Sequence, residues 1–510
     1  MQTEAQYIEK IAALEQVNRE LLESKNYYKN YSDQLHRIIQ NFKRNRFGKR
    51  SEAYHHPDQT LFDFINELEP AKEPKQETIT IEKHKRKKTR KNTIELPTQI
   101  VIIPVDEKDK ICACGKRKEV IRYNVTRRLN HQPEAYDLIE ERREVVACTN
   151  HCEGSIQAAK APKRFLPNTN ITESFLANLI ISKFEDRQPL YHLEKKLESR
   201  YGINFSRQNM ARNAIKAGDN MVPLYNLMHD RVMNHDIASM DATTIQVLDE
   251  PNRDPSTKSY MYCFRGGGKT GRVILYEYNE KEHQVFIDNW FEGFSGYVHS
   301  DADTFFNKLY EQDHVHSVLC NAHARRKFEP IAKASKKAVL AHHAMKVYRK
   351  LYAIERKAKD EELNHKQIKQ LRQKYAAPIL KEFKTWLESK INLVPKQSPI
   401  FDAMRYVIKH WKGLTRYLND GRLSIDNNHT EREIKPFVIA RKNFMFSKSQ
   451  EGARAMAIHF SLIRTAKLHG LDPYRYYVHI MEKIPRCKTI DDYEKLLPWR
   501  VDLSKVITSS

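Results

Sequence analysis

The chain has 510 residues, with 88 Lys and Arg against 65 Asp and Glu, a formal net charge of +23 and a pI near 9.5. Its 15 Gly and 20 Pro argue against a fibrous or disordered protein, and it contains neither a long apolar run nor a secretory signal. We expect a cytoplasmic protein of several structural units, with a polyanion as the first candidate partner, although a merely soluble basic protein has the same charge.

The first patterned segment is a heptad repeat of apolar residues: Tyr7, Leu14, Leu21, Tyr28, Leu35 and Phe42. The alternate seam is apolar at Ile11 and Ile39 and polar in its middle. This pattern fits a short coiled coil whose register is set by a buried Asn18, and it also fits a single amphipathic helix packed on its own protein. We assign residues 1–50 to an N-terminal coiled-coil helix.

Residues 51–95 form a predicted linker that ends in KHKRKKTRK, with seven basic residues among the nine at 83–91. Such a run is usually solvated, but it can also lie along phosphates and add salt-dependent affinity without sequence preference. Both interpretations stay open.

Four cysteines in two close pairs mark the next unit, residues 96–165: Cys112, Cys114, Cys148 and Cys152. About thirty residues with strand character separate the pairs. In a cytosolic protein this spacing predicts a tetrahedral structural Zn²⁺ site, because each pair can hold one side of the ion. The C-x-C spacing is tighter than usual and His151 is a competing ligand, so reduced surface thiols are the alternative.

Residues 166–230 contain a helical pattern with a break at Gly202. Apolar residues from Leu190 to Tyr201 mark one face of a first helix, and Ser206 can cap a second. The arrangement predicts a helix-turn-helix that contacts DNA, with a plain helical hairpin as the alternative. The residues expected to contact DNA are Arg207, Gln208 and Arg212.

The pattern then changes to short strands: IASMDATTIQVLD (237–249), SYMYCFRGGGKTGRVILYEY (259–278), SGYVHSD (295–301) and VHSVLCNAHA (315–324). A helix is expected near 282–291. We interpret GGGK as a hairpin turn, because Cys263 stands where a phosphate-binding loop needs Gly and a strand follows. From about 325 to 420 the chain is rich in Lys, Ala and Leu, and we expect it to be helical.

Three carboxylates in this region could perform chemistry: Asp241 in the first strand, Asp301 at a strand end and Glu431 at a helix start. Together they could hold two Mg²⁺ ions, which prefer oxygen ligands, for phosphodiester cleavage. Each acid alone has an ordinary explanation. Strand-end Asp residues cap turns, and Glu431 and Glu433 could occupy the first turn of a helix that is capped by Asp426 or Asn428.

Several segments together carry a resemblance to a known family: FGKRSE, SMDATT, GYVHSD, CNAHARRKF at 320–328, and IDNNHTERE followed by RKNFMF. They resemble transposases of the insertion sequence 66 family, a group with an Asp-Asp-Glu triad on an RNase H-like fold. The resemblance covers nearly the whole chain. It implies a multidomain α+β protein with an RNase H-like catalytic core at 231–465, a helical insertion at about 330–420 and a small C-terminal domain at 466–510.

The resemblance places the triad at Asp241, Asp301 and Glu431, with two Mg²⁺ or Mn²⁺ ions as cofactors, and makes Glu433 the less favoured choice. The chain departs from the family pattern after both aspartates. Ala242 and Thr243 replace the common Glu-Thr, and Ala302 and Asp303 replace the common Gly-Tyr. Asp303 is therefore a rival metal ligand.

The implied function is cleavage of double-stranded DNA at transposon ends and joining of those ends to target DNA by a bacterial, nucleoid-associated enzyme. A homodimer or higher oligomer and helper proteins of the same element are the expected partners. Two alternatives stay open: a nuclease without strand transfer, and a catalytically inactive DNA-binding relative. Further residues expected to contact DNA are Arg325, Arg326, Arg432, Arg441 and Lys442, although the first two could be surface arginines at a helix start.

Overall fold

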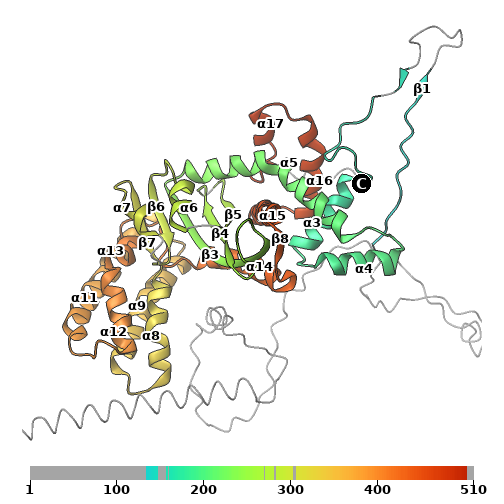
Figure 1. Cartoon of the computed structure of the whole chain (residues 1–510). Coiled ribbons are helices and arrows are strands. Elements are labelled where there is room, and N and C mark those ends of the chain that lie inside the picture. The colour runs from blue at the N-terminus through green and yellow to red at the C-terminus, as the bar shows by residue number, and fades with distance from the viewer. Residues whose placement is uncertain are drawn as a thin grey trace, which may run out of the picture. The chain divides into compact units, whose positions relative to one another are not determined.

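The computed structural model describes residues 134–146, 157–158, 160–268, 270–280, 283–302 and 306–501 (Figure 1). The chain divides into two units, Met1–Asp137 and Leu138–Ser510, and all the described helices and strands belong to the second. The predicted coiled coil, the basic linker and the four cysteines of the predicted zinc site lie outside the described residues. No helix in the described part of the chain is long and apolar enough to cross a membrane.

A mixed sheet forms the centre of the second unit. Its strands are β3 (Ile237–Asp249), β4 (Lys258–Gly266), β5 (Val273–Asn279), β6 (Gly296–Ser300), β7 (Val315–Leu319) and β8 (Ser447–Ser449). The order is β5-β4-β3-β6-β7, and β8 also pairs with β3. Strands β3, β4 and β5 are antiparallel neighbours, whereas β6 and β7 run parallel to β3. The predicted hairpin turn is confirmed, since Gly267 and Gly268 both have positive φ between β4 and β5.

Side chains alternate across the sheet and give its two faces different partners. On one face, Phe264 stacks on Trp290 of α6 (His283–Trp290), with ring centroids 3.5 Å apart. On the other face, Tyr276 donates a hydrogen bond to the carbonyl of Glu433 in α14 (Asn428–Phe444). Strand residues on the face of Tyr276 therefore lie against α14, which carries the conspicuous acidic residues.

Two helices, α5 (Arg207–Met233) and α15 (Gln450–Leu468), pack together and against β5. Because β5 is an edge strand, its outer backbone groups need partners. The backbone N–H of Tyr276 donates to Ser461 Oγ at 2.7 Å, and that of Ile274 donates to Thr465 Oγ1 at 3.0 Å. Hydroxyls of α15 thus close this edge of the sheet.

The helices predicted for residues 330–420 are present between β7 and α14, and we call this segment the helical insertion (Figure 1). It consists of α8 (Asn321–Ala334), α9 (Val339–Asp360), α10 (His365–Leu371), a π-helical turn (Arg372–Ala376), α11 (Ala377–Ile391), α12 (Pro399–Lys409), α13 (Trp411–Thr415) and a 3₁₀ turn (Arg416–Leu418). Its apolar core includes Phe328, Tyr348 and Phe383 and continues into Val318 and Leu319 of β7. The insertion is therefore anchored to the sheet by shared side-chain packing.

The β-rich segment at 315–324 contains the end of a strand and the start of a helix. Strand β7 ends at Leu319, close to the expected end at Cys320, and α8 begins at Asn321 after the extended Cys320. The segment that follows, AHARRKF, contains Ala, Arg and Lys, which favour helix. The consequence is that His323 and Arg326 lie on the first turns of a helix.

The predicted helix, glycine turn and second helix are also present. Helix α4 (Leu190–Tyr201) ends at Gly202 in the left-handed conformation, with φ 67°, and α5 begins after Ser206, whose side chain accepts from the Asn209 N–H. Before them comes α3 (Glu173–Phe184). The remaining elements are β1 (Val145–Val146), β2 (Gln157–Ala158), α7 (Asn307–Glu311), α16 (Pro473–Lys483), a 3₁₀ turn (Ile484–Arg486) and α17 (Ile490–Glu494).

Candidate active site

Strand register brings the two predicted aspartates together. Ser239 of β3 pairs with His299 of β6, and both strands run in the same direction. Continuing that register by two residues places Asp241 of β3 beside Asp301, which directly follows β6. Because two residues restore the same face of a strand, both side chains lie on the face covered by α14.

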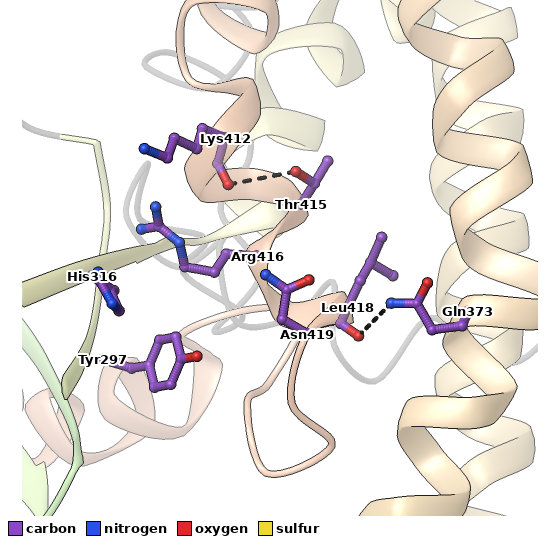
Figure 2. Close-up of a pocket in the computed structure, with 8 residues that line it drawn as sticks. All are labelled: Tyr297, His316, Gln373, Lys412, Thr415, Arg416, Leu418 and Asn419. Carbon is purple, nitrogen blue, oxygen red and sulfur yellow. Dashed lines mark hydrogen bonds between the residues drawn. The ribbon is translucent and has the colours of Figure 1, made fainter.

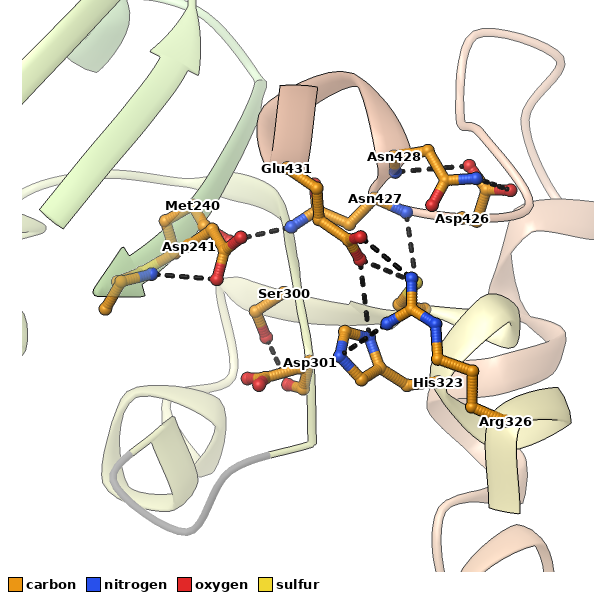
Figure 3. Close-up of polar contacts among 12 residues, drawn as sticks. Met240, Asp241, Ser300, Asp301, His323, Arg326, Asp426, Asn427, Asn428 and Glu431 are labelled. Atoms are coloured by element: carbon orange, nitrogen blue, oxygen red, sulfur yellow. Dashed lines mark hydrogen bonds and ion pairs between the residues drawn. The ribbon is translucent and has the colours of Figure 1, made fainter. Parts of the chain in front are cut away.

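Glu431 reaches the same region from the first turn of α14 and is 5% exposed. Figure 3 shows Asp241, Asp301 and Glu431 in one neighbourhood, each carried by a different element. The electrostatics agree with this placement. Burial, followed by the negative charges of Glu431 and Asp301, raises the pKa of Asp241 to about 8, against the opposing effects of the Ala242 N–H and Arg326.

In the structure the Glu431 carboxylate is held by α8. Arg326 Nη2 donates to Glu431 Oε2 at 2.8 Å, and His323 Nδ1 lies 3.6 Å from Oε1 (Figure 3). The His323 Nδ1 atom is buried and has no hydrogen-bond partner at that distance. The Arg326 guanidinium therefore supplies the positive charge that a buried carboxylate requires.

Sequence reasoning missed Cys320 as a neighbour of Glu431. The thiol lies 4.0 Å from Glu431 Oε1, and the potential ligand atoms of Cys320, His323 and Glu431 all lie within 4.8 Å of one another. The i, i+3 spacing of Cys and His at a strand-to-helix junction is the sequence signal for this group. A thiol and an imidazole suit Zn²⁺ better than Mg²⁺, whereas Asp241 and Asp301 offer the oxygen ligands that Mg²⁺ prefers.

Asn427 fixes the beginning of α14 on the sheet. Its side-chain amide donates to the carbonyl of Met240 at 2.8 Å, and its backbone N–H lies 3.2 Å from Cys320 Sγ. The predicted cap at Asp426 or Asn428 is wrong by one residue, since Asn427 occupies the cap position and its side chain bonds to β3. Tertiary bonding to the strand next to Asp241 has replaced local capping.

Asp426 and Asn428 support the beginning of α14 by bonding to each other. Asp426 accepts hydrogen bonds from the Asn428 backbone at 3.2 Å, the Asn428 amide at 2.9 Å and the Tyr352 hydroxyl of α9 at 2.9 Å. The helical insertion therefore contacts the turn that presents Glu431.

Glu433, the rival of Glu431, belongs to a different cluster. Its carboxylate accepts two hydrogen bonds from Arg464 of α15, at 2.8 and 3.1 Å. It is also two residues further along α14, so only Glu431 lies in the first turn. This ion pair gives Glu433 a structural role between two helices.

A family model described as Transposase IS66 family matches residues 168–455, which is more than half of the chain. The chain belongs to the IS66 transposase family. Two further models match outside that segment: the IS66 C-terminal element at 461–499, and the Transposase C of IS166 homeodomain at 34–99. The resemblance inferred from the sequence is thus confirmed.

Similar proteins include y4jD and y4hP of Sinorhizobium fredii (strain NBRC 101917 / NGR234), both named as uncharacterized proteins. The first is 27% identical over 79% of this chain and 80% of y4jD. The second is 26% identical over 78% of this chain and 74% of y4hP. These relatives extend the likeness over most of the chain, and their names state no activity.

The predicted DNA-contacting residues of this IS66 family member lie in three places. Arg207, Gln208 and Arg212 are exposed on the first turns of α5, while Arg432 and Lys442 are exposed on α14. Arg325 and Arg326 are half-buried on α8. Arg326 donates to Glu431. Arg441 is also half-buried and donates to Thr243 Oγ1 at 3.1 Å and Thr244 Oγ1 at 2.9 Å, which ties α14 to β3.

Asp303, the rival metal ligand, lies outside the described residues.

A separate cavity of about 500 Å³ lies where β6 and β7 meet the insertion (Figure 2). Its lining includes Tyr297, His316, Lys412 and Arg416 and contains no carboxylate. Tyr297 precedes Asp301 by four residues of β6. Because a strand rises about 3.3 Å per residue, the cavity lies about 13 Å from the acidic site.

Proposed function

We propose that this protein is a DNA transposase that cleaves transposon ends and joins the freed 3′-hydroxyls to target DNA. The observation that supports this most is the convergence of Asp241, Asp301 and Glu431 from β3, the end of β6 and α14, with the pKa of Asp241 raised by burial and by the other two acids. Carboxylates that repel one another in a buried site are stabilised by a divalent cation. Membership of the IS66 transposase family supplies the reaction class.

In this proposal the three carboxylates hold two Mg²⁺ or Mn²⁺ ions, which when bound would activate the attacking oxygen and stabilise the leaving oxygen of an in-line displacement. Glu431 would exchange its ion pair with Arg326 for the metal site, so Arg326 becomes available to a phosphate oxygen. Asn427 keeps the first turn of α14 on β3 during this exchange, because its amide bonds to the backbone beside Asp241.

The domain arrangement is part of the same proposal. The RNase H-like assignment of residues 231–465 is supported by the antiparallel β3, β4 and β5, followed by β6 and β7 parallel to β3. The pair α4 and α5 would bind the terminal repeats as a helix-turn-helix, the four cysteines would hold structural Zn²⁺, and the N-terminal helix would pair protomers so that two ends are brought together.

Incubation of labelled transposon-end DNA with the protein and Mg²⁺ or Mn²⁺ tests the function, with reactions run alone and with the other proteins of the element. We expect hydrolysed ends and end-to-target joined products from the wild type. Asp241→Asn and Asp301→Asn should abolish both products and leave DNA binding intact. Asp249→Asn, at the exposed end of the same strand β3, is the matched control and should remain active.

Hydrolysed ends without joined products would support the nuclease alternative. Binding without either product, even with the other proteins of the element, would contradict the proposal and favour a DNA-binding relative.

A further inference from the structure

A group of cations lies beside the acidic site, on the same face of the sheet. Ser239 pairs with Arg265 of β4 on one side and with His299 of β6 on the other, so these three side chains form one row. The row of Asp241 and Asp301 is two residues further along, about 7 Å away. The first turn of α14 covers the row of Ser239, because Thr430 Oγ1 donates to Ser239 Oγ at 2.9 Å.

Two more arginines join Arg265. Arg272 stands two residues before Ile274, the register partner of Arg265, so alternation directs both arginines to the same face. Arg432 comes from α14 and donates through Nη2 to His429 Nδ1 at 2.8 Å. Arg265 is half-buried, whereas Arg272 and Arg432 are exposed, so the group opens to solvent.

The like charges of these three arginines repel one another. Burial lowers the pKa of Arg265, and the charges of Arg272 and Arg432 lower it further, while Glu433 acts in the opposite direction. Glu433 is itself paired with Arg464. Among the residues that the structure describes, no carboxylate lies within ion-pair distance of Arg265, Arg272 or Arg432. Such an arrangement favours an external anion.

Two histidines add neutral polar groups to this site. Because His429 Nδ1 accepts from Arg432, the neutral ring carries its proton on Nε2 and can donate there. His299 is 6% exposed, and its Nε2 atom has no partner in the structure.

We propose that Arg265, Arg272 and Arg432, with His429, bind one backbone phosphate of the DNA strand that enters the acidic site. The inference rests on the proposed function only for the identity of the anion. Since one DNA strand rises 3.4 Å per nucleotide along the helix axis, a separation of about 7 Å places this phosphate within about two nucleotides of the scissile phosphate. The contact fixes the position of the strand and carries no sequence preference.

The test measures binding of uncleaved transposon-end DNA without Mg²⁺, using duplexes with one neutral methylphosphonate at each successive position across the end. One position should weaken wild-type binding about tenfold, as expected for loss of hydrogen bonds to a charged group. The same substitution should change binding of Arg265→Gln or Arg272→Gln less than twofold. For each variant, the logarithm of the DNA-binding constant should also depend less steeply on the logarithm of the salt concentration, with a slope smaller by about 1.

Arg405→Gln is the matched control, because Arg405 is exposed on α12 and already paired with Asp402 at 3.1 Å. It should retain the wild-type methylphosphonate profile. Arg272 is exposed, so its variant keeps the test valid if Arg265→Gln fails to fold. Identical profiles and salt slopes for folded Arg272→Gln and wild type would overturn the phosphate site. The protein could also cleave no DNA and still show one methylphosphonate position that weakens wild-type binding but not binding of the arginine variants. That result would support the phosphate site and reject the transposase proposal.

Discussion

Among the carboxylates assigned to the proposed site, Asp241 has a pKa that is raised to about 8. Its raised pKa means that the folded, metal-free protein holds a proton on this carboxyl at neutral pH. A divalent cation must displace that proton, so metal binding at pH 7 should release it and strengthen as pH rises toward 8. Under the proposed mechanism, a metal ion would stabilise the charged form of this residue.

The same shift predicts a pH dependence of stability. The pKa of Asp241 rises from an ordinary 3.8 to about 8 on folding, so the folded protein binds this proton more tightly than the unfolded chain. The resulting stability is fully present below about pH 4 and is lost as pH rises to about 8. In Mg²⁺-free buffer, the Tm of wild type should therefore fall more between pH 5 and pH 8 than the Tm of Asp241→Asn. Parallel Tm curves for the two proteins would show that Asp241 does not titrate in this range.

At the scale of the element, α14 combines an acidic first turn with bonds that fix its position on β3. Asn427 bonds to β3 at its beginning, and Arg441 bonds to Thr243 and Thr244 of β3 near its end. Glu431 lies between these anchors, and its orientation depends on both. A helix that was capped only locally would lack this connection to the strand that carries Asp241.

Asn427→Ala should destabilise the protein by about 1–3 kcal/mol, because it leaves the buried carbonyl of Met240 without its donor. Cleavage should fall as well, since the first turn of α14 loses its attachment beside Asp241. Urea unfolding and single-turnover cleavage measure the two effects. Asn443→Ala, which removes an exposed bond to the Arg187 carbonyl at the other end of α14, should change either quantity little.

Particular residues show how far the sequence predicts this site. The IASMDATTIQVLD segment predicted a strand that the structure confirms over 237–249, and α14 begins where the acidic segment suggested. The pairing of Ser239 with both Arg265 and His299 could not be predicted, because register depends on contacts between segments far apart in the chain. The cap at Asn427 was missed for a similar reason, since a tertiary bond replaced the local one.

At the scale of the whole molecule, the helical insertion supports the acidic site from outside the sheet. Arg372 is buried and makes two hydrogen bonds to Glu355, at 2.7 and 2.8 Å. Through Nη1 it also donates to the carbonyls of Tyr417 and Asp420, at 2.9 and 3.1 Å. These carbonyls begin the segment that leads to Asn427 and α14, so the insertion fixes the approach to Glu431.

Arg372→Ala should cost about 3–5 kcal/mol, because it leaves Glu355 and two carbonyls without a buried partner. Denaturant unfolding measures this loss, and cleavage should fall with it because the segment before α14 is released. Arg405→Ala, which removes an exposed ion pair of the same insertion, should cost less than about 1 kcal/mol. Equal effects of the two substitutions would show that the buried pair does not hold the insertion in place.

The assignment of Glu431 is tested most directly by comparing Glu431→Gln with Glu433→Gln in single-turnover cleavage of transposon-end DNA with Mg²⁺. Both substitutions remove one negative charge from α14, two residues apart. The account predicts that Glu431→Gln abolishes cleavage and joining while DNA binding is kept. Glu433→Gln should retain cleavage with some loss of stability, because only its ion pair with Arg464 is weakened. Loss of cleavage in a stably folded Glu433→Gln, with activity retained in Glu431→Gln, would contradict the proposed site.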